Sequence, residues 1–118
     1  MNLTIGGKEY QLEFGLGFIR ELDKAYTIKA DGMEFGMGVE SAVSYLAMEN
    51  PTVLFEIIKA GTSHLKSKPS NVDIELFLVE HAEKGTLENL FKDVQEAMAE
   101  APFLKLKIKR FKEETAHL

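Results

Sequence analysis

Residues 1–14 read MNLTIGGKEYQLEF and decide how the fold begins. Two adjacent glycines, Gly6 and Gly7, separate two short stretches in which apolar and polar residues alternate. Adjacent glycines supply the positive φ angles that a two-residue hairpin turn requires. The pattern therefore predicts an antiparallel β-hairpin in which Ile5 lies opposite Lys8. This register places five apolar side chains on one face of the hairpin: Met1, Leu3, Ile5, Tyr10 and Leu12.

A two-stranded hairpin is only marginally stable in water by itself, so its apolar face needs a cover. Helical periodicity in residues 17–100 predicts that cover, because apolar residues recur three and four positions apart in five stretches. The residues expected to face the core are Phe18, Ile19, Leu22, Ala25 and Tyr26, then Val39, Val43, Leu46 and Ala47, then Val53, Leu54, Ile57 and Ile58, then Ile74, Phe77, Leu78 and His81, and finally Leu87, Leu90, Phe91, Val94 and Met98.

Several residues indicate where these helices begin and end. Asn50 and Pro51 predict the start of the third helix, since Asn is a favoured N-cap and Pro fits the first helical position. Gly61 is expected to stop that helix as the residue after its C-cap. Gly85 is expected to close the fourth helix, and Thr86 is expected to cap the fifth.

Residues 27–38 read TIKADGMEFGMG and are predicted to form a loop. Gly32, Gly36 and Gly38 are expected to make this segment flexible. An alternative hypothesis gives the loop a function, since flexible surfaces rich in methionine adapt to different protein partners. The side chains that would act as a mobile apolar hook are Met33, Phe35 and Met37.

The C-terminal segment, residues 101–118, has an ambiguous pattern. Alternation of Leu104, Leu106 and Ile108 with lysines is typical of a strand. We favour a helix, because Pro102 fits a helix start and the glutamates further on are good helix formers. The segment is strongly basic through Lys105, Lys107, Lys109, Arg110 and Lys112.

Charge is distributed unevenly along the chain. Residues 71–100 hold eight acids and two lysines, whereas residues 101–112 hold five bases and no acid. Three interpretations of the basic segment remain open: a solvated helix face, self-association against the acidic helices of a neighbouring copy, or contact with nucleic acid. The net charge of −5 argues against general nucleic-acid binding, which needs basic residues clustered over a face.

The composition excludes several kinds of chemistry. The chain has no cysteine, which rules out disulfides, cysteine-ligated metal sites and thiol catalysis. His64, His81 and His117 lack the spacing of metal ligands, and no serine lies in a nucleophile-elbow motif. No apolar run approaches the roughly 20 residues that span a membrane, and the N-terminus lacks the pattern of a secretory signal. We therefore expect no catalytic residue, no cofactor, no metal and no contact with a membrane.

Two longer stretches carry a resemblance to a known family. They are FGLGFIRELDKAY at residues 14–26 and FGMGVESAVSYLAMENPTVLFEIIKAGT at residues 35–62. Preceded by LTIGGKEYQLEF, this pattern resembles the tail assembly chaperones of long-tailed phages and prophages of Gram-positive bacteria. The resemblance implies a non-enzymatic protein that coats the tape measure protein, keeps it soluble and leaves as tail tube subunits polymerise. It also implies action in the cytoplasm of the bacterial host and absence from the mature virion.

In this family many genes also make a longer product by ribosomal frameshifting, and its extra domain is thought to recruit tail tube protein. The chain would correspond to the shorter product. A different class of function is the alternative: a small adaptor or regulator that binds a single protein partner stoichiometrically.

The sequence thus predicts an α+β fold that is mainly helical, with the N-terminal hairpin packed on about five helices. We expect one domain over residues 1–118, divided into the hairpin at 1–14, a helical body at 17–100 and a basic tail at 101–118. Self-association is expected beside client binding. The candidate partner-binding residues are Met33, Phe35, Met37, Lys105, Lys107, Lys109 and Arg110.

Overall fold

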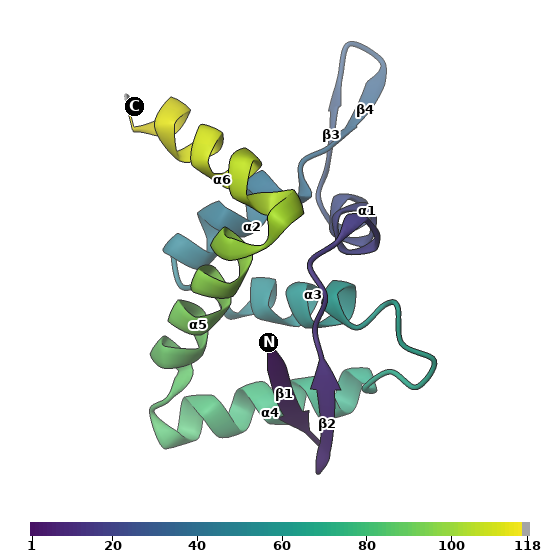
Figure 1. Ribbon diagram of the computed structural model, residues 1–118, viewed down its shortest axis with the longest axis vertical. Coiled ribbons are helices and arrows are strands. Elements are labelled where there is room, and N and C mark those ends of the chain that lie inside the picture. Colours follow the sequence, from purple (N-terminus) through teal and green to yellow (C-terminus); the bar gives the residue numbers. More distant parts are fainter. Residues whose placement is uncertain (117–118) are drawn as a thin grey trace.

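The computed structural model describes residues 1–116 of the chain, so His117 lies outside the described residues. Within that range the fold is α+β and mainly helical, as predicted, with two separate two-stranded antiparallel sheets (Figure 1). The elements in chain order are β1 (Asn2–Ile5), β2 (Lys8–Gln11), α1 (Leu16–Ala25), β3 (Thr27–Ala30), β4 (Met33–Gly36), α2 (Gly38–Ala47), α3 (Pro51–Gly61), α4 (Asn71–Lys84), α5 (Leu87–Glu100) and α6 (Pro102–Thr115).

The N-terminal hairpin has the predicted register. Ile5 pairs with Lys8, and the turn glycines Gly6 and Gly7 have φ angles of 59° and 77°. The main-chain N–H of Leu12 donates to the Met1 carbonyl at 2.8 Å, which extends the pairing by one step. Of the five apolar side chains expected on one face, Met1 is half-buried and the other four are buried. The alternating pattern was therefore sufficient to orient this hairpin.

Helix α3 lies at the centre of the fold, with α1, α2 and α4 packed around it. Its N-terminus is capped as predicted, since the Asn50 side chain accepts a hydrogen bond from the Thr52 N–H at 3.2 Å. The four apolar residues expected to be buried on this helix expose at most 1% of their surface: Val53, Leu54, Ile57 and Ile58. Burial of this kind is the main favourable contribution to folding.

The predicted role of Gly61 is wrong. Gly61 is the last helical residue of α3 and Thr62 is the C-cap, so Gly61 does not lie beyond the helix end. A Cβ atom at Gly61 would come within 3.0 Å of the Leu12 side chain, and the Glu13 N–H donates to the Gly61 carbonyl at 2.9 Å. Glycine is found here because the chain after β2 passes close to the end of α3.

The C-terminal half is helical throughout the described residues, which confirms the helix expected after residue 101. Gly85 ends α4 in the left-handed conformation, with a φ of 73°, as predicted. Thr86 occupies the N-cap position of α5, as predicted, but its side chain makes no capping hydrogen bond: its hydroxyl lies 2.7 Å from Nδ1 of His81. In α6, Leu104 and Ile108 are buried against the rest of the protein, and the helix packs on α5 and α2.

Two alanines predicted to face the core are exposed. Ala25 is the last residue of α1 and Ala47 is the last residue of α2. Helical periodicity assigns a face to each residue but does not reveal where the helix runs past the core.

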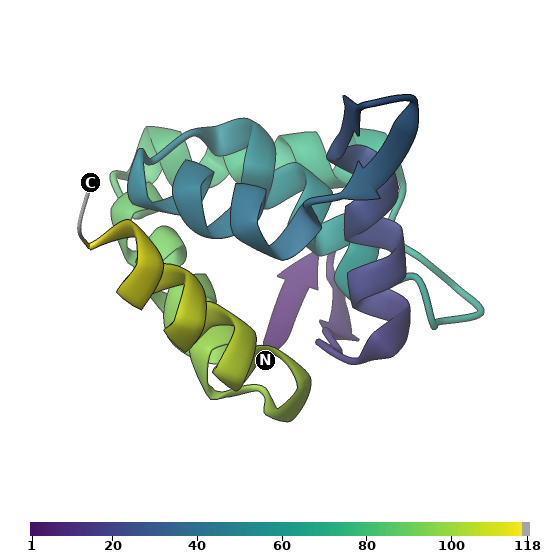
Figure 2. The same cartoon turned by 90° about the horizontal axis from the view of Figure 1, so that it is seen from above.

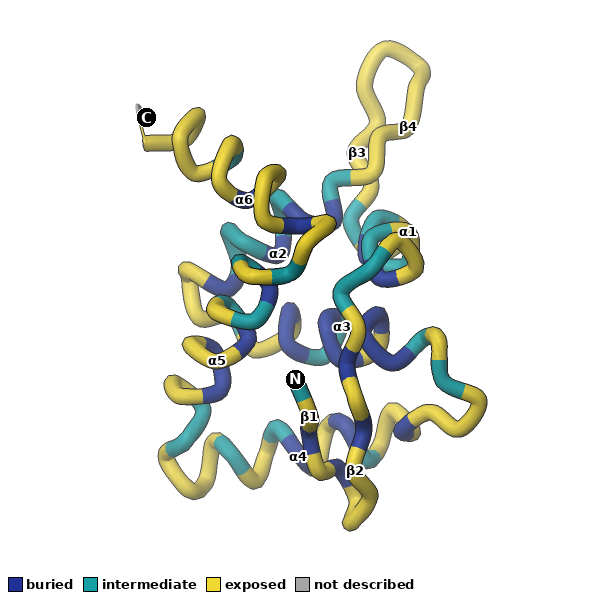
Figure 3. Tube along the Cα trace, viewed as in Figure 1, coloured by how far each residue is buried: buried dark blue, intermediate teal, exposed yellow. Residues whose placement is uncertain are grey.

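Residues 27–38 do not form the predicted loop. They contain the second hairpin, in which β3 and β4 pair from Thr27 with Gly36 to Ala30 with Met33. The turn residues Asp31 and Gly32 have φ angles of 51° and 76°, as a primed two-residue turn requires. Asp-Gly is a preferred pair for that turn, so the sequence did contain the signal. Figure 1 shows this hairpin extending beyond the helices, and Figure 3 shows it exposed along its whole length.

The contrast between α3 and the outer face of α4 can be tested with the same substitution at two leucines. Leu54 is completely buried in α3, whereas Leu76 is more than half exposed on α4. We expect Leu54→Ala to lower the free energy of unfolding by about 2–5 kcal/mol, because it leaves a cavity in the core. Leu76→Ala is expected to change it by about 0.5 kcal/mol or less. Chemical denaturation measures both, and equal losses would contradict the burial described here.

Candidate protein-binding surface

The β3–β4 hairpin has an uncovered apolar face. Ile28 lies opposite Phe35 and Ala30 lies opposite Met33, so these four side chains share one side of the hairpin. The three large side chains among them are between 45% and 59% exposed. The two hook residues Met33 and Phe35 are therefore brought together on a structured surface rather than on a loop.

The opposite face of the same hairpin is polar. Lys29 lies opposite Glu34, and Nζ of the lysine is 3.5 Å from Oε1 of the glutamate. Both side chains are largely exposed, so this ion pair contributes little to stability, about 0–1 kcal/mol. The hairpin is thus amphipathic although it stands away from the core, which leaves its apolar face available to a partner.

The base of the hairpin is held by Asp23 at the end of α1. One carboxylate oxygen of Asp23 accepts the Gly38 N–H at 2.8 Å, at the first residue of α2. A Cβ atom at Gly36 would approach the Asp23 side chain to 2.5 Å, and one at Gly38 would approach the backbone of Leu22 and Asp23 to 2.7 Å. Gly36 and Gly38, expected to loosen a loop, instead permit a close approach between α1 and the chain entering α2.

An apolar groove continues the hairpin face. It runs along α2 between the base of the hairpin and α6 and encloses about 290 Å³. Figure 2, viewed from above, shows α2 lying between these two elements. The side chains that matter for its character are Ile28, Met37, Tyr45, Met48 and Phe111. Because Ile28 belongs to both the groove and the hairpin face, the two form one continuous apolar surface.

The third predicted hook residue, Met37, is separated from the other two. It is half-buried and lines the groove, and its main-chain N–H donates to the Tyr26 carbonyl at 2.8 Å. Sequence reasoning missed four residues of this surface: Ile28, Tyr45, Met48 and Phe111. A hairpin assignment from Asp31-Gly32 would have found Ile28, but the approach of α6 to α2 is a tertiary feature with no local signal.

Tyr26 packs against Tyr45, which lines the groove. Their ring centroids are 5.7 Å apart and the rings are tilted by 36°. Burial raises the pKa of the Tyr26 phenol, with smaller contributions from the charge of Glu56 and from Tyr45. The Tyr26 phenol is therefore neutral at physiological pH, where it contributes aromatic packing rather than acid–base chemistry.

The predicted basic residues of α6 do not act as one set. Lys107 faces α2, where its Nζ lies 3.4 Å from Oε2 of Glu40, and the other Glu40 oxygen is buried without a hydrogen-bond partner. Lys105, Lys109 and Arg110 are exposed, and the Lys107 side chain is itself 47% exposed although it pairs with Glu40. Lys107 is therefore part of the contact between α6 and α2, and three basic side chains remain for an external partner.

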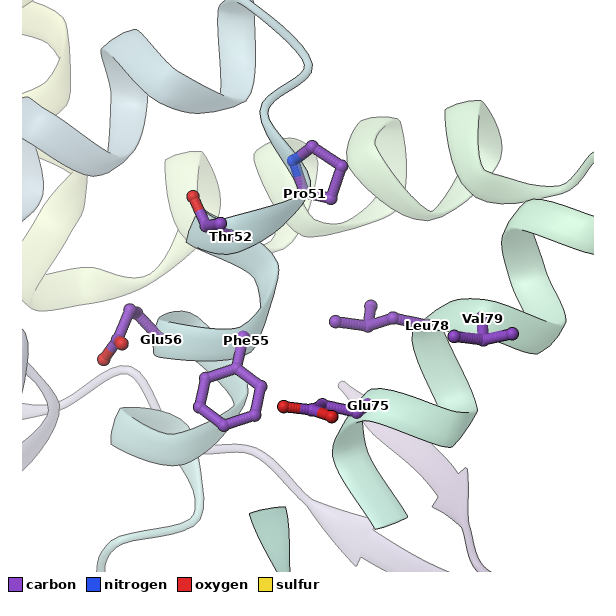
Figure 4. A pocket seen from close by; sticks show the side chains of 7 residues that line it. All are labelled: Pro51, Thr52, Phe55, Glu56, Glu75, Leu78 and Val79. Atoms are coloured by element: carbon purple, nitrogen blue, oxygen red, sulfur yellow. The ribbon is translucent and has the colours of Figure 1, made fainter. Parts of the chain in front are cut away.

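A second apolar groove lies between α3 and α4 and encloses about 470 Å³. Pro51 and Phe55 from α3 face Leu78 and Val79 from α4, with Glu75 at the side (Figure 4). This groove was not predicted, because only one face of α4 was expected to be apolar. The available signal was a second apolar series on that helix, Val72, Leu76 and Val79, spaced four and three residues apart.

Apolar contact surfaces are the main feature of the described residues. Within residues 1–116, no three His, Asp or Glu side chains are placed to share a metal ion. In the same range, none of the helices combines the length and the apolar character needed to cross a bilayer. The hairpin face and the grooves provide apolar surface with flexible methionine side chains and charged residues around it. Such a surface is suited to binding protein segments.

Comparison with known families agrees with this conclusion. The sequence model of the family described as "Phage tail assembly chaperone protein, TAC" matches residues 2–113. The chain belongs to this family. The match includes both hairpins and all but the last residues of α6, so it extends beyond the two stretches that carried the resemblance. No curated protein and no solved structure matches the chain. As a tail assembly chaperone, the protein is expected to have protein partners in tail assembly.

The close approach at Asp23 predicts opposite effects of alanine at two glycines. Gly38→Ala would place a Cβ atom against backbone that cannot move aside, so we expect a loss of about 1–3 kcal/mol in the free energy of unfolding. Gly17 lies on α1 with open space around it. We therefore expect Gly17→Ala to leave the free energy of unfolding unchanged or to raise it by up to about 1 kcal/mol. Thermal and chemical denaturation measure both, and an equally stable Gly38→Ala protein would contradict the constraint.

Proposed function

We propose that this tail assembly chaperone binds and solubilises the tape measure protein during tail morphogenesis, without catalysing a reaction. The observation that supports this most directly is the uncovered apolar face of the β3–β4 hairpin, continued by the groove along α2. A protein that keeps a client soluble must offer apolar surface that its own fold leaves uncovered. Such surface on a small monomer commonly marks a binding site.

The chemistry of this surface suits a client with many similar apolar segments. Methionine side chains are flexible and polarisable, so Met33, Met37 and Met48 adapt to differently shaped partners. The hairpin joins the core only at its base, through Asp23 and the strand ends, so the apolar face is displayed away from the helices. Each contact is small, which favours reversible binding and release as the tail tube grows.

The net charge of −5 supports the same function. Copies of one sign repel each other at long range and remain dispersed when many are present, and a coated client acquires that charge. We propose that the chaperone acts over its whole length as one domain in the cytoplasm of the bacterial host and is absent from the mature virion. We further propose that a longer frameshift product recruits tail tube protein, and that nucleic acid is not a partner.

The direct test is co-expression with the long coiled-coil tape measure protein encoded by the same phage or prophage. We expect the client to become soluble and to purify with many copies of the chaperone, measured by pull-down and mass determination. A client that stays insoluble beside a chaperone that purifies alone would contradict the proposal. A compact partner bound one-to-one would instead support the adaptor alternative.

The apolar hairpin face can be tested against the polar face of the same hairpin. We expect the double variant Met33→Ser/Phe35→Ser to weaken client binding about tenfold or more, because it removes two large apolar side chains from the contact. The matched control is Lys29→Ser/Glu34→Ser, which alters the other face and should bind the client like the unmodified protein. Binding is measured by titration with a soluble client segment, after thermal unfolding shows both variants folded. Equal affinity of the two variants would reject the hairpin as the client site.

A further inference from the structure

We propose that Glu40 determines the specificity of the groove along α2: its carboxylate selects partner segments that carry a basic side chain between apolar ones. This inference rests on the proposed function, because it names the kind of client segment that the surface would bind. It can fail while that function stands, since apolar contact alone would hold a client without any selection for charge.

Glu40 is the one charged residue among the described residues that line this groove, and the large side chains around it are apolar. It lies in the first turn of α2. Ile28 and Met37 line the groove at the hairpin end, whereas Tyr45 and Met48 line it further along the helix. Glu40 and Met48 are eight residues apart, so they are separated by about 12 Å along the helix axis. A segment lying along the groove therefore meets apolar side chains on both sides of a single carboxylate.

The Glu40 carboxylate is incompletely paired. Among the described residues, Oε1 is buried without a hydrogen-bond partner, and Oε2 lies 3.4 Å from Nζ of Lys107. That distance is longer than the roughly 2.7–2.9 Å of a good charge-assisted hydrogen bond. An ionised carboxylate can accept about four hydrogen bonds, and leaving a buried one without donors is unfavourable. The carboxylate therefore has unused capacity for a donor that a partner brings.

Lys107 is a replaceable partner for this carboxylate. Its side chain is 47% exposed, so its ammonium group can return to water when it is released. Lysine is a single flexible charge, whereas arginine presents several donors in a planar fork that matches both oxygens of a carboxylate. The last torsion of a glutamate side chain is broad, so a rotation of the Glu40 carboxylate can turn Oε1 towards a donor in the groove. An arginine from a partner would then pair with both oxygens.

Charge complementarity favours a basic segment over the two other kinds of segment. A purely apolar segment would cover the carboxylate without supplying a donor, which adds a desolvation cost to binding. An acidic segment would place a like charge beside Glu40. A basic side chain with apolar neighbours satisfies the carboxylate and fills the apolar ends of the groove. The occupant that fits this surface is therefore an apolar segment with an arginine or lysine near the hairpin end.

Two substitutions break the same ion pair and separate selection by Glu40 from a purely structural role. Glu40→Gln removes the charge at nearly constant shape, and we expect it to weaken binding of a basic peptide about tenfold or more. Lys107→Met removes the competing cation but keeps a long side chain, and we expect it to strengthen binding of the same peptide about two- to fivefold. If Glu40 only attached α6 to α2 through Lys107, both substitutions would change the affinity in the same direction.

The probe is a library of random peptides of about 12 residues, long enough to follow the groove, displayed on yeast and selected against the purified chain. We expect the selected peptides to be enriched in arginine or lysine between apolar residues. The tightest peptide and a copy with norleucine in place of its basic residue are then titrated by fluorescence anisotropy. Unmodified protein should prefer the basic peptide, and Glu40→Gln should bind both peptides about equally.

Glu80→Gln is the matched control for general attraction to an acidic protein. It removes the same charge from an exposed position on α4, which lies towards the other end of the molecule from α6 (Figure 1). We expect it to bind the basic peptide like the unmodified protein. Thermal unfolding checks that each variant is folded. If Glu40→Gln does not fold, Lys107→Met decides the question, because it should strengthen binding of the basic peptide and leave binding of the norleucine peptide unchanged.

Three results would overturn the proposal: selected peptides without enrichment in basic residues, equal affinity of Glu40→Gln and unmodified protein for the basic peptide, or weaker binding of that peptide by Lys107→Met. Co-expression with the tape measure protein tests the proposed function separately. A client that Glu40→Gln keeps soluble as well as the unmodified protein does would refute selection by charge and leave the function intact. An insoluble client beside a clear peptide preference that depends on Glu40 would refute the function and leave the groove's selectivity intact.

Discussion

The hydrogen bond from Gly38 to the carboxylate of Asp23 is the constraint on which the binding surface depends. It fixes the end of α1 against the start of α2, and it leaves no room for a side chain at Gly36 or Gly38. The eleven residues between Tyr26 and Gly38 must therefore leave the helices and return to them at nearly the same point. A hairpin satisfies that requirement, and it satisfies its own backbone hydrogen bonds without help from the core. The apolar face stays uncovered because the attachment at the base directs the hairpin away from the helices.

The two hairpins of this protein show how burial determines what the same local structure does. Both have a two-residue turn with positive φ angles and one apolar face. The N-terminal hairpin lies against α4 through β1, Leu12 just after β2 approaches the end of α3 at Gly61, and Leu3, Ile5 and Leu12 are part of the core. The β3–β4 hairpin contributes no buried side chain. A hairpin without tertiary cover is marginally stable by itself, so its order comes from the base and its face can adjust to a partner.

Features that depend on neighbouring residues in the chain could be predicted from the sequence, and features that depend on distant ones could not. The register of the first hairpin and the buried stripe of α3 follow from alternation and periodicity. The second hairpin was missed because Gly36 and Gly38 were interpreted as loop residues. Their actual role depends on Asp23, which is at least 13 positions away in the chain. The basic character of α6 was clear in the sequence, but the engagement of Lys107 with Glu40 required the packing of α6 on α2. The candidate client residues were found only in part for the same reason.

Exposed apolar side chains lie on two separate parts of the protein. The proposed client surface lies on the β3–β4 hairpin and on the side of α6 that faces α2, through Phe111. Other exposed apolar side chains lie on the opposite side of α6 and on the outer face of α4. Because these surfaces do not share side chains, a partner bound at one would leave the other uncovered. Each copy that binds one client would also bring a net charge of −5, so repulsion between copies would increase with their number and oppose the apolar attraction of each copy for the client. Such a balance favours assemblies that persist on a client and come apart without it, since the client supplies the additional contact that offsets the repulsion.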